Sequence, residues 1–265
     1  MMHRTLVVLL NLLFCAGCLC LAAQRGFAQT EESLTARLAA SDEEQRLALL
    51  VDLSALFKTT LRAAHPATVA ALVNILQSDT APIIRTHAAR ALELAGDPTA
   101  SDGLLAALKT EKELATRKAI IYALARYHAP QVTAALLPLL KHKEQEVRAT
   151  AAYALAELAD TAAANALLEI VEKRRKDQDA FARSQAVRGL GRIGYQAATP
   201  VLLTVLQKDK AAIVRREAAI ALGWLTTTQR ADVRAALRTA AQDDDPYLRE
   251  AAEAALSRIS ARPTS

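Results

Sequence analysis

A short pattern that recurs along most of the chain constrains its fold more than any other feature. Its clearest copy, residues 183–195, reads RSQAVRGLGRIGY, and copies in the same register begin at six other arginines. The seven anchor arginines are Arg46, Arg85, Arg117, Arg148, Arg183, Arg215 and Arg249. Successive anchors lie 31 to 39 residues apart, and each is followed seven positions later by a leucine. Such a period predicts an array of units that bury their apolar faces by stacking on one another.

Each unit reads as two helices. Apolar residues recur at helical spacing after the anchor, as in Ala186, Val187 and Leu190, and again in a leucine-rich stretch that follows, as in Leu202 and Leu206. We therefore expect an arginine-anchored helix followed by a leucine-rich helix. Glycines and prolines are predicted at the helix boundaries. Helices are expected to end at Gly96 and Gly194 and to begin at Pro66, Pro82, Pro98, Pro130 and Pro246. A kink is expected at Pro138.

The form R-x-x-A-A-x-A-L-G-x-I-G, as written in residues 183–194, resembles the HEAT repeat family, in particular the bacterial HEAT-like repeats of the phycobilisome-lyase type. The resemblance covers residues 42–260. It implies an all-α fold, a right-handed α-solenoid of about six to seven stacked helix pairs. Other copies lack the glycines, and Asp52 replaces the alanine before Leu53. The same repeat serves scaffolds, adaptors and a few enzymes, so it specifies fold better than function.

The first 28 residues have the pattern of a secretory signal. A basic start is followed by an apolar run from Leu6 to Ala23 and by small residues, which predicts cleavage after Ala28. A lead over residues 29–41 and a tail over residues 261–265 then flank the solenoid. We expect export to a bacterial periplasm or secretion. The alternative is an envelope lipoprotein acylated at Cys18, which would meet a membrane through that lipid alone.

Charge and cysteine content narrow the partner classes. Removing residues 1–28 takes away Arg4 and Arg25 and lowers the formal net charge from +5 to +3. The basic residues are dispersed in short clusters rather than in one stripe, which argues against a nucleic-acid partner. All three cysteines, Cys15, Cys18 and Cys20, lie in the signal segment, so no disulfide framework is expected in the rest.

The anchor arginines lie on the inward side of a helical wheel and therefore need partners. An acidic residue stands six positions before most anchors, with His142 in its place before Arg148. The residues predicted to act as ion pairs between repeats or as loop locks are Arg85, Arg117, Arg148, Arg183, Arg215, Arg249, Asp79, Asp177, Asp209 and Asp243, with Glu111 in an equivalent position. We assign them a structural role rather than a binding role.

Positions two, five and nine after each anchor point toward solvent on the same wheel. Tyrosine, tryptophan and arginine, which dominate interface energetics, are frequent there. The candidate partner-binding face comprises Arg90, Tyr122, Arg126, Tyr153, Glu157, Arg188, Arg192 and Trp224. The alternative is an ordinary solvated helix face. The leucine-rich helices are expected to line the concave side with small residues. The basic run 173–176 is either a grip for an acidic partner or anionic lipid, or a solvated loop.

Signals for catalysis are weak. Gly189-x-Gly191-x-x-Gly194 matches a dinucleotide fingerprint in spacing, but it is expected in the last turns of a helix rather than after a strand. The histidines after the signal segment stand apart, without the paired spacing of a metal site, so neither a cofactor nor a metal is predicted. Two hypotheses remain: a non-enzymatic scaffold that binds a protein, and a lyase-like or other enzymatic accessory factor.

Overall fold

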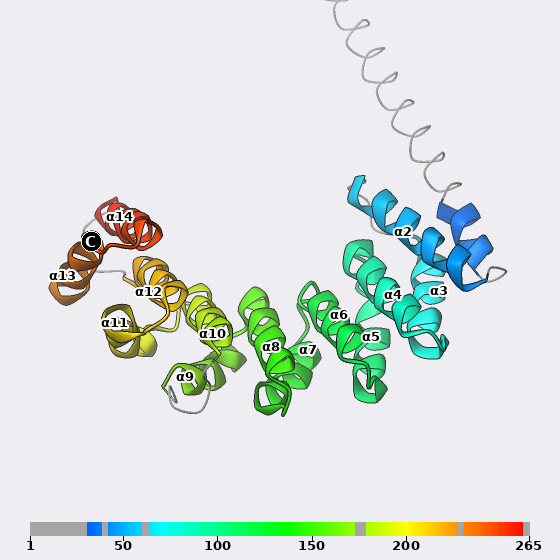
Figure 1. Cartoon of the computed structure of the whole chain (residues 1–265), viewed down its shortest axis with the longest axis horizontal. Coiled ribbons are helices and arrows are strands. Elements are labelled where there is room, and N and C mark those ends of the chain that lie inside the picture. Colours follow the sequence, from blue (N-terminus) through cyan, green and yellow to red (C-terminus); the bar gives the residue numbers. More distant parts are fainter. Residues whose placement is uncertain (1–30, 39–41, 60–63, 173–178, 227–229, 262–265) are drawn as a thin grey trace, which may run out of the picture. The chain divides into compact units, whose positions relative to one another are not determined.

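Helices alone make up the part of the chain that the computed structural model describes, which is residues 31–38, 42–59, 64–172, 179–226 and 230–261 (Figure 1). This confirms the prediction of an all-α solenoid of stacked helix pairs. The predicted signal segment, Cys18, the basic run 173–176 and Asp177 lie outside the described residues. The chain divides into two units, residues 1–107 and 108–265, which are described separately.

The first unit contains a helix over residues 31–38 and the longest helix of the chain's first half, α2 (Glu43–Thr59). It continues with α3 (Pro66–Ser78), α4 (Pro82–Ala95) and most of α5 (Ala100–Thr110). Helix α4 packs against both α2 and α3. The leucines of the repeat pattern, Leu53, Leu72 and Leu92, are completely buried between these helices. The helix over residues 31–38 was not predicted and precedes the first anchor.

The second unit continues the alternation of helices. Its elements are α6 (Leu114–Leu124), α7 (Pro130–Leu136), η1 (Leu137–Lys141), α8 (Gln145–Leu158), η2 (Thr161–Ala163), α9 (Ala164–Glu172), α10 (Ala180–Ile193), η3 (Gln196–Ala198), α11 (Thr199–Lys208), α12 (Ala212–Leu225), α13 (Ala231–Ala240) and α14 (Pro246–Ser260). Gly194 ends α10 as predicted and adopts the left-handed conformation with φ 77°. At Pro138, where a kink was predicted, α7 has given way to the 3₁₀-helix η1.

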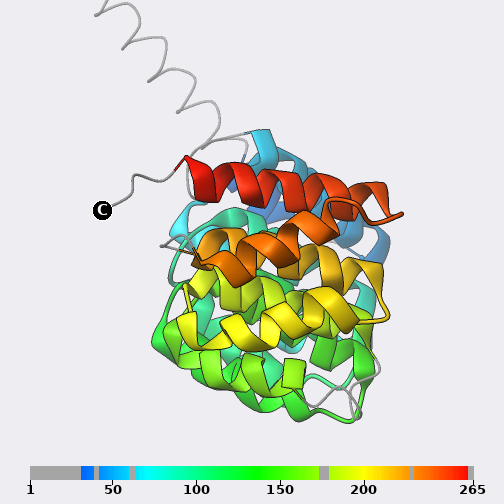
Figure 2. The same ribbon diagram turned by 90° about the vertical axis from the view of Figure 1, so that its left-hand side faces the viewer.

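The pairing of helices differs from the prediction. Arginine-anchored helices pack on the leucine-rich helix before them, as α10 does on α9, α12 on α11 and α14 on α13. The α11–α12 and α13–α14 turns both lie at the right-hand edge in Figure 2. The helices were predicted correctly but their pairing was not, because the turn whose carbonyl oxygens bind the anchor arginine precedes that arginine.

The anchored helices form one layer, which we call the Arg layer: α6, α8, α10, α12 and α14. Neighbouring members of this layer pack directly on each other, and it lies on the inner side of the curve of this unit, with α7, α9, α11 and α13 outside (Figure 1). The prediction that the leucine-rich helices line the concave side was therefore wrong for the second unit. Small residues allow the close approach of the Arg layer, and these are concentrated in the anchored helices.

Glycines mark the closest contacts within the Arg layer. A Cβ at Gly191 would lie 2.8 Å from the Ala221 side chain and 2.9 Å from the Ala221 Cα, and a Cβ at Gly223 would meet Ala255 at the same distances. Each contact joins the eighth position after one anchor to the sixth position after the next. Two glycines of the apparent dinucleotide fingerprint, Gly189 and Gly191, thus serve helix packing, and the third, Gly194, ends α10.

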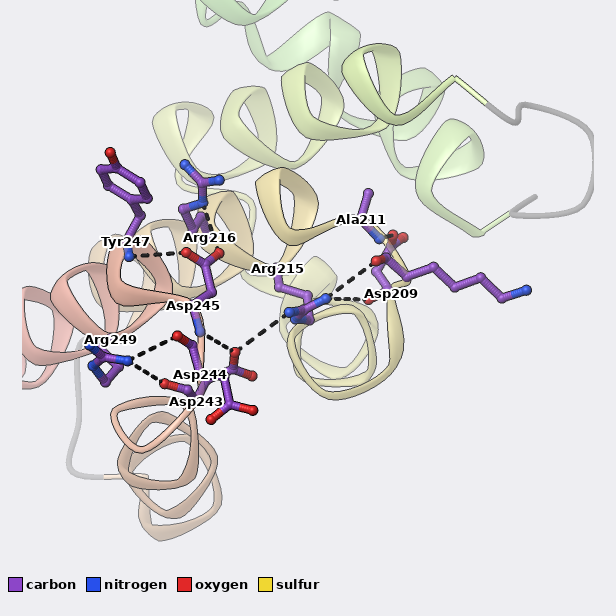
Figure 3. Close-up of polar contacts among 10 residues, drawn as sticks. Asp209, Ala211, Arg215, Arg216, Asp243, Asp244, Asp245, Tyr247 and Arg249 are labelled. Atoms are coloured by element: carbon purple, nitrogen blue, oxygen red, sulfur yellow. Dashed lines mark hydrogen bonds and ion pairs between the residues drawn. The ribbon is translucent and has the colours of Figure 1, made fainter.

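The anchor arginines tie the turns together. Arg183 is only 8% exposed, and its guanidinium donates two hydrogen bonds, of 3.1 and 2.9 Å, to the carboxylate of Asp209 in the following turn. Asp209 Oδ1 also accepts the backbone N–H of Ala211, and its carbonyl oxygen accepts Nη1 of Arg215 (Figure 3). One aspartate therefore shapes its own turn, binds the arginine of its own helix and holds the arginine of the previous repeat.

Other repeats use the same arrangement. Ion pairs join Arg46 to Asp79 at 3.0 Å and Arg215 to Asp243 at 3.6 Å. The arginines also donate to the carbonyl oxygens of their own turns, and these bonds are Arg85 to Asp79, Arg117 to Glu111, Arg148 to His142 and Arg249 to Asp243. Figure 3 shows this pattern for Arg215 and Arg249.

One bond between an anchor arginine and the following turn is weaker, because His142 stands where other turns have an acidic residue. Its Nδ1 lies 3.1 Å from the backbone nitrogen of Glu144, and its Nε2 lies 3.2 Å from Nη1 of Arg117. A neutral imidazole has one acceptor nitrogen, so it cannot accept from both donors at once. The aspartates at this position accept from both, which makes the link between α6 and α8 the poorer one.

We expect Arg183→Ala to lower the free energy of unfolding by about 3 kcal/mol, because it leaves the buried Asp209 carboxylate without its guanidinium. Urea denaturation followed by circular dichroism measures this. The matched control is Arg230→Ala, which breaks an exposed pair with Asp232 and should change stability little. Equal losses in the two variants would show that the buried pair has no special role.

We expect Gly191→Ala to lower the free energy of unfolding by about 1 to 2 kcal/mol, because overpacking against Ala221 outweighs the gain in helix propensity. Adding Ala221→Gly to this variant should recover part of the loss by giving the new methyl group room. The same two variants measured singly and together in thermal melts test this. A stabilising Gly191→Ala would mean that the Arg layer is not closely packed here.

Candidate partner-binding surface

Three positions of the repeat form the exposed side of the Arg layer. They are the second residue before each anchor arginine and the fifth and ninth residues after it. These positions fall within about 40° of one another on a helical wheel, opposite the core. The second position after the anchor, which was predicted to face solvent, is covered in three repeats. Ala119 and Gln185 are 5% exposed and Thr150 is 2% exposed. Neighbouring helices of the layer cover this position.

We call the resulting row in the second unit the inner stripe. Its members are Ala115, Tyr122 and Arg126 on α6, Glu146, Tyr153 and Glu157 on α8, Phe181, Arg188 and Arg192 on α10, Ile213, Ile220 and Trp224 on α12, and Tyr247, Ala254 and Arg258 on α14. The layer thus brings together seven of the eight candidate residues. The eighth, Arg90, is exposed at the corresponding position of α4 in the first unit.

Three exposed apolar residues in this stripe were missed by the sequence analysis. Phe181 is 41% exposed, Ile213 is 39% exposed and Tyr247 is 63% exposed, and each lies two positions before its anchor. The first unit has Ile83 at the same position of α4, also exposed. The next residue along the chain, such as Val214 or Leu248, already fills the core. A search for exposed apolar residues at a fixed repeat position could have found them.

Aromatic side chains begin the stripe. The rings of Tyr122 and Tyr153 meet edge to face, with centroids 5.2 Å apart and an interplanar angle of 63°. Both side chains are half-buried. Such a pair offers a large rigid surface with polar hydroxyl groups, which is typical of binding surfaces.

An arginine cluster follows the aromatic pair. The carboxylate of Glu157 on α8 binds both Arg188 and Arg192 of α10, at 3.2 and 2.9 Å, and the Glu157 carbonyl oxygen accepts a further bond from Arg192. The glutamate side chain is 25% exposed, whereas the two arginine side chains are 35% and 32% exposed. The cluster therefore presents mainly guanidinium groups to solvent.

A second cluster, made of basic, acidic and aromatic side chains, lies where the stripe ends at α12 and α14. Arg216 lies over the ring of Tyr247, 5.0 Å from its centroid, and forms a 3.3 Å ion pair with Asp245 (Figure 3). Asp245 also caps α14 by accepting the N–H of Tyr247. Burial raises the pKa of the nearby Glu217 carboxyl, and the positive charges of Arg188 and Arg216 partly oppose that rise.

The outer layer carries a separate groove of about 960 Å³ between α7–η1 and α9. Most of its lining is apolar, including Leu137, Pro138 and Ile170. Its polar groups engage one another: Lys141 lies 4.0 Å from Glu169, and Asn165 accepts a hydrogen bond from the Tyr195 hydroxyl. His142 and Arg148 line one end and belong to the turn described above.

Two negative findings apply to the described ranges only. No group of three or more histidine, cysteine, aspartate or glutamate side chains there is arranged to hold a metal ion. Within the same residues, no helix has the length and apolar character needed to cross a membrane.

Comparison with known proteins places the fold. The family described as HEAT repeats matches residues 31–125, 101–178 and 170–257. The structure of the CpcE and CpcF complex of phycocyanin lyase from Nostoc sp. PCC7120 is similar with a TM-score of 0.58 and 25% identity, over 76% of this chain and 80% of that chain.

An engineered protein, target OR497, is similar with a TM-score of 0.57 and 23% identity, over 88% of this chain and 69% of that chain, which supports the fold alone. No curated protein sequence matches the chain. The residues matched by the family lie in both units and include the anchor arginines, the packed glycines and the stacked hairpins described above. The chain belongs to the HEAT repeat family.

Proposed function

We propose that this chain is an exported, non-catalytic scaffold or adaptor that binds a protein partner through the inner stripe of its HEAT repeats. The observation that carries the proposal is the row of exposed aromatic, aliphatic and arginine side chains on consecutive helices. Phe181, Ile213 and Tyr247 stay exposed beside core residues such as Val214 and Leu222, which have no exposed surface. Clustered exposed apolar residues of this kind mark interaction sites.

The composition of the stripe fits a protein partner better than other partner classes. Tyrosine, tryptophan and arginine contribute most of the binding energy at protein interfaces. The basic and acidic groups of the stripe are interleaved, as in the pairs of Glu157 with Arg188 and Arg192. A nucleic-acid surface requires a more uniformly basic stripe. Neither a cofactor nor a metal enters the proposed function.

The proposal of export rests on the signal pattern of residues 1–28. The proposed location is a bacterial periplasm or the exterior, with an envelope lipoprotein acylated at Cys18 as the alternative. Mass analysis of the mature N-terminus distinguishes cleavage after Ala28 from lipidation. Contact with a membrane belongs to the lipidated form only.

The likeness to the phycocyanin lyase complex favours a second candidate, an accessory factor in an enzymatic reaction. That structure is a complex of two chains, so it is also consistent with binding a protein partner on this kind of fold. The two candidates differ in the fate of the partner. A covalent change in the mass of a captured partner after incubation with this chain favours the enzymatic role, and an unchanged mass favours the scaffold.

We expect replacement of Tyr122, Tyr153 and Trp224 by serine to abolish capture of the partner while circular dichroism still reports a helical fold. All three side chains lie in the inner stripe and none is fully buried. A crosslinked pull-down from native envelope extract, followed by mass spectrometry, compares this variant with the unaltered chain.

The matched control replaces exposed residues of the outer layer, Gln207, Lys208 and Arg238, by serine. This variant should capture the same protein as the unaltered chain. The proposal is wrong if the inner-stripe variant captures the partner normally, or if the outer-layer variant alone loses it.

A further inference from the structure

An apolar strip runs along α12 within the inner stripe. All three stripe positions of this helix are apolar: Ile213, Ile220 and Trp224. On the next helix, the stripe continues with Tyr247, the most exposed of the large apolar residues described. Arg216 lies one helical turn from both isoleucines and covers the Tyr247 ring. The strip can therefore take apolar side chains of a partner at the junction of α12 and α14.

A donor-rich surface flanks this strip on α10. Arg188 and Arg192 share the single carboxylate of Glu157, which lies beneath them and is less exposed than either. At the α14 end of the strip the arginine side chain is again more exposed than its carboxylate partner: Arg216 is 34% exposed and Asp245 is 16% exposed. Each guanidinium carries five N–H donors, more than one carboxylate can accept. Glu157, Asp245 and the half-buried Glu217 neighbour these guanidinium groups. A partner carboxylate can accept the N–H donors that these three carboxylates leave over.

The distance between neighbouring helices of the Arg layer fits a partner that is itself a helix. Packed helices lie about 8 to 10 Å apart. A partner helix that crosses them repeats its contact residues about 10.5 Å apart at intervals of seven residues. Apolar residues on one such position can therefore meet α12 while an acidic residue seven positions away meets α10. Amphipathic helices bind grooves in other proteins through contacts of this kind.

We infer that the partner segment bound by the inner stripe is an amphipathic α-helix. Its apolar residues pack on Ile213, Ile220, Trp224 and Tyr247, and a carboxylate two turns away binds Arg188 and Arg192. This inference rests on the proposed function and specifies the chemistry of the partner. Selectivity comes from the guanidinium pair, and most of the buried area comes from the apolar strip.

Trp224 provides a direct reporter, because it is the single tryptophan of the chain and lies in the strip. The probe is a synthetic amphipathic helix without tryptophan, with leucine on one face and glutamate seven residues from it. A twin peptide has lysine in place of glutamate. Fluorescence titration of the full chain should give saturable binding of the acidic peptide and binding at least about tenfold weaker for the lysine twin, a difference of roughly 1.4 kcal/mol.

Three variants test the separate contacts. Ile220→Ser should weaken binding of the acidic peptide about tenfold. Arg192→Glu should reverse the preference in favour of the lysine twin, a gain that misfolding cannot produce. Arg238→Glu, on the exposed side of α13, is the matched control and should leave both affinities unchanged.

The outcomes separate this inference from the proposed function. Equal binding of the two peptides, or no binding of either, overturns the acidic-helix inference. If the pull-down still depends on the inner stripe in that case, the scaffold proposal stands and only the chemistry of the partner is wrong. If the pull-down also fails, both are wrong. Weakening of the acidic peptide by salt is expected in addition, since exposed charges are screened.

Discussion

The bond between an anchor arginine and the aspartate of the following turn is the interaction on which the repeat stack depends. Arg183 and Asp209 illustrate it, because both are almost fully buried and each would be an uncompensated buried charge without the other. The same aspartate shapes its turn by accepting the N–H of Ala211. Since one residue performs both tasks, the orientation of each hairpin and its contact with the previous hairpin are set together.

The exposed surface follows from this arrangement. The arginine bonds hold the anchored helices in register, and small residues such as Gly191 and Gly223 allow them to approach closely. Close packing covers the flanks of each helix and leaves a narrow row of positions in contact with solvent. Residues that occupy this row on consecutive helices therefore lie side by side, although they are more than 30 residues apart in sequence. A repeat fold thus converts periodic substitutions into a continuous binding surface.

The sequence predicted the helices, the anchor residues and the family, because helical spacing and a repeated arginine are local signals. It gave the wrong helix pairing, since two helices separated by short turns look equivalent until their contacts are known. It also placed Thr150 and Gln185 in solvent, because a helical wheel takes no account of neighbours on both flanks. Phe181, Ile213 and Tyr247 were missed for a different reason: apolar residues in a helix are ordinarily assigned to the core.

Cysteine labelling measures most directly whether a protein partner covers the inner stripe. The chain has no cysteine after Cys20, so single cysteines can be introduced once Cys15, Cys18 and Cys20 are replaced by serine. Maleimide labelling at positions 146 and 181 of the inner stripe, which make none of the proposed contacts, should be slowed by the bound partner, and labelling at positions 207 and 238 of the outer layer should not. Protection of the outer positions alone would contradict binding of the partner to the inner stripe.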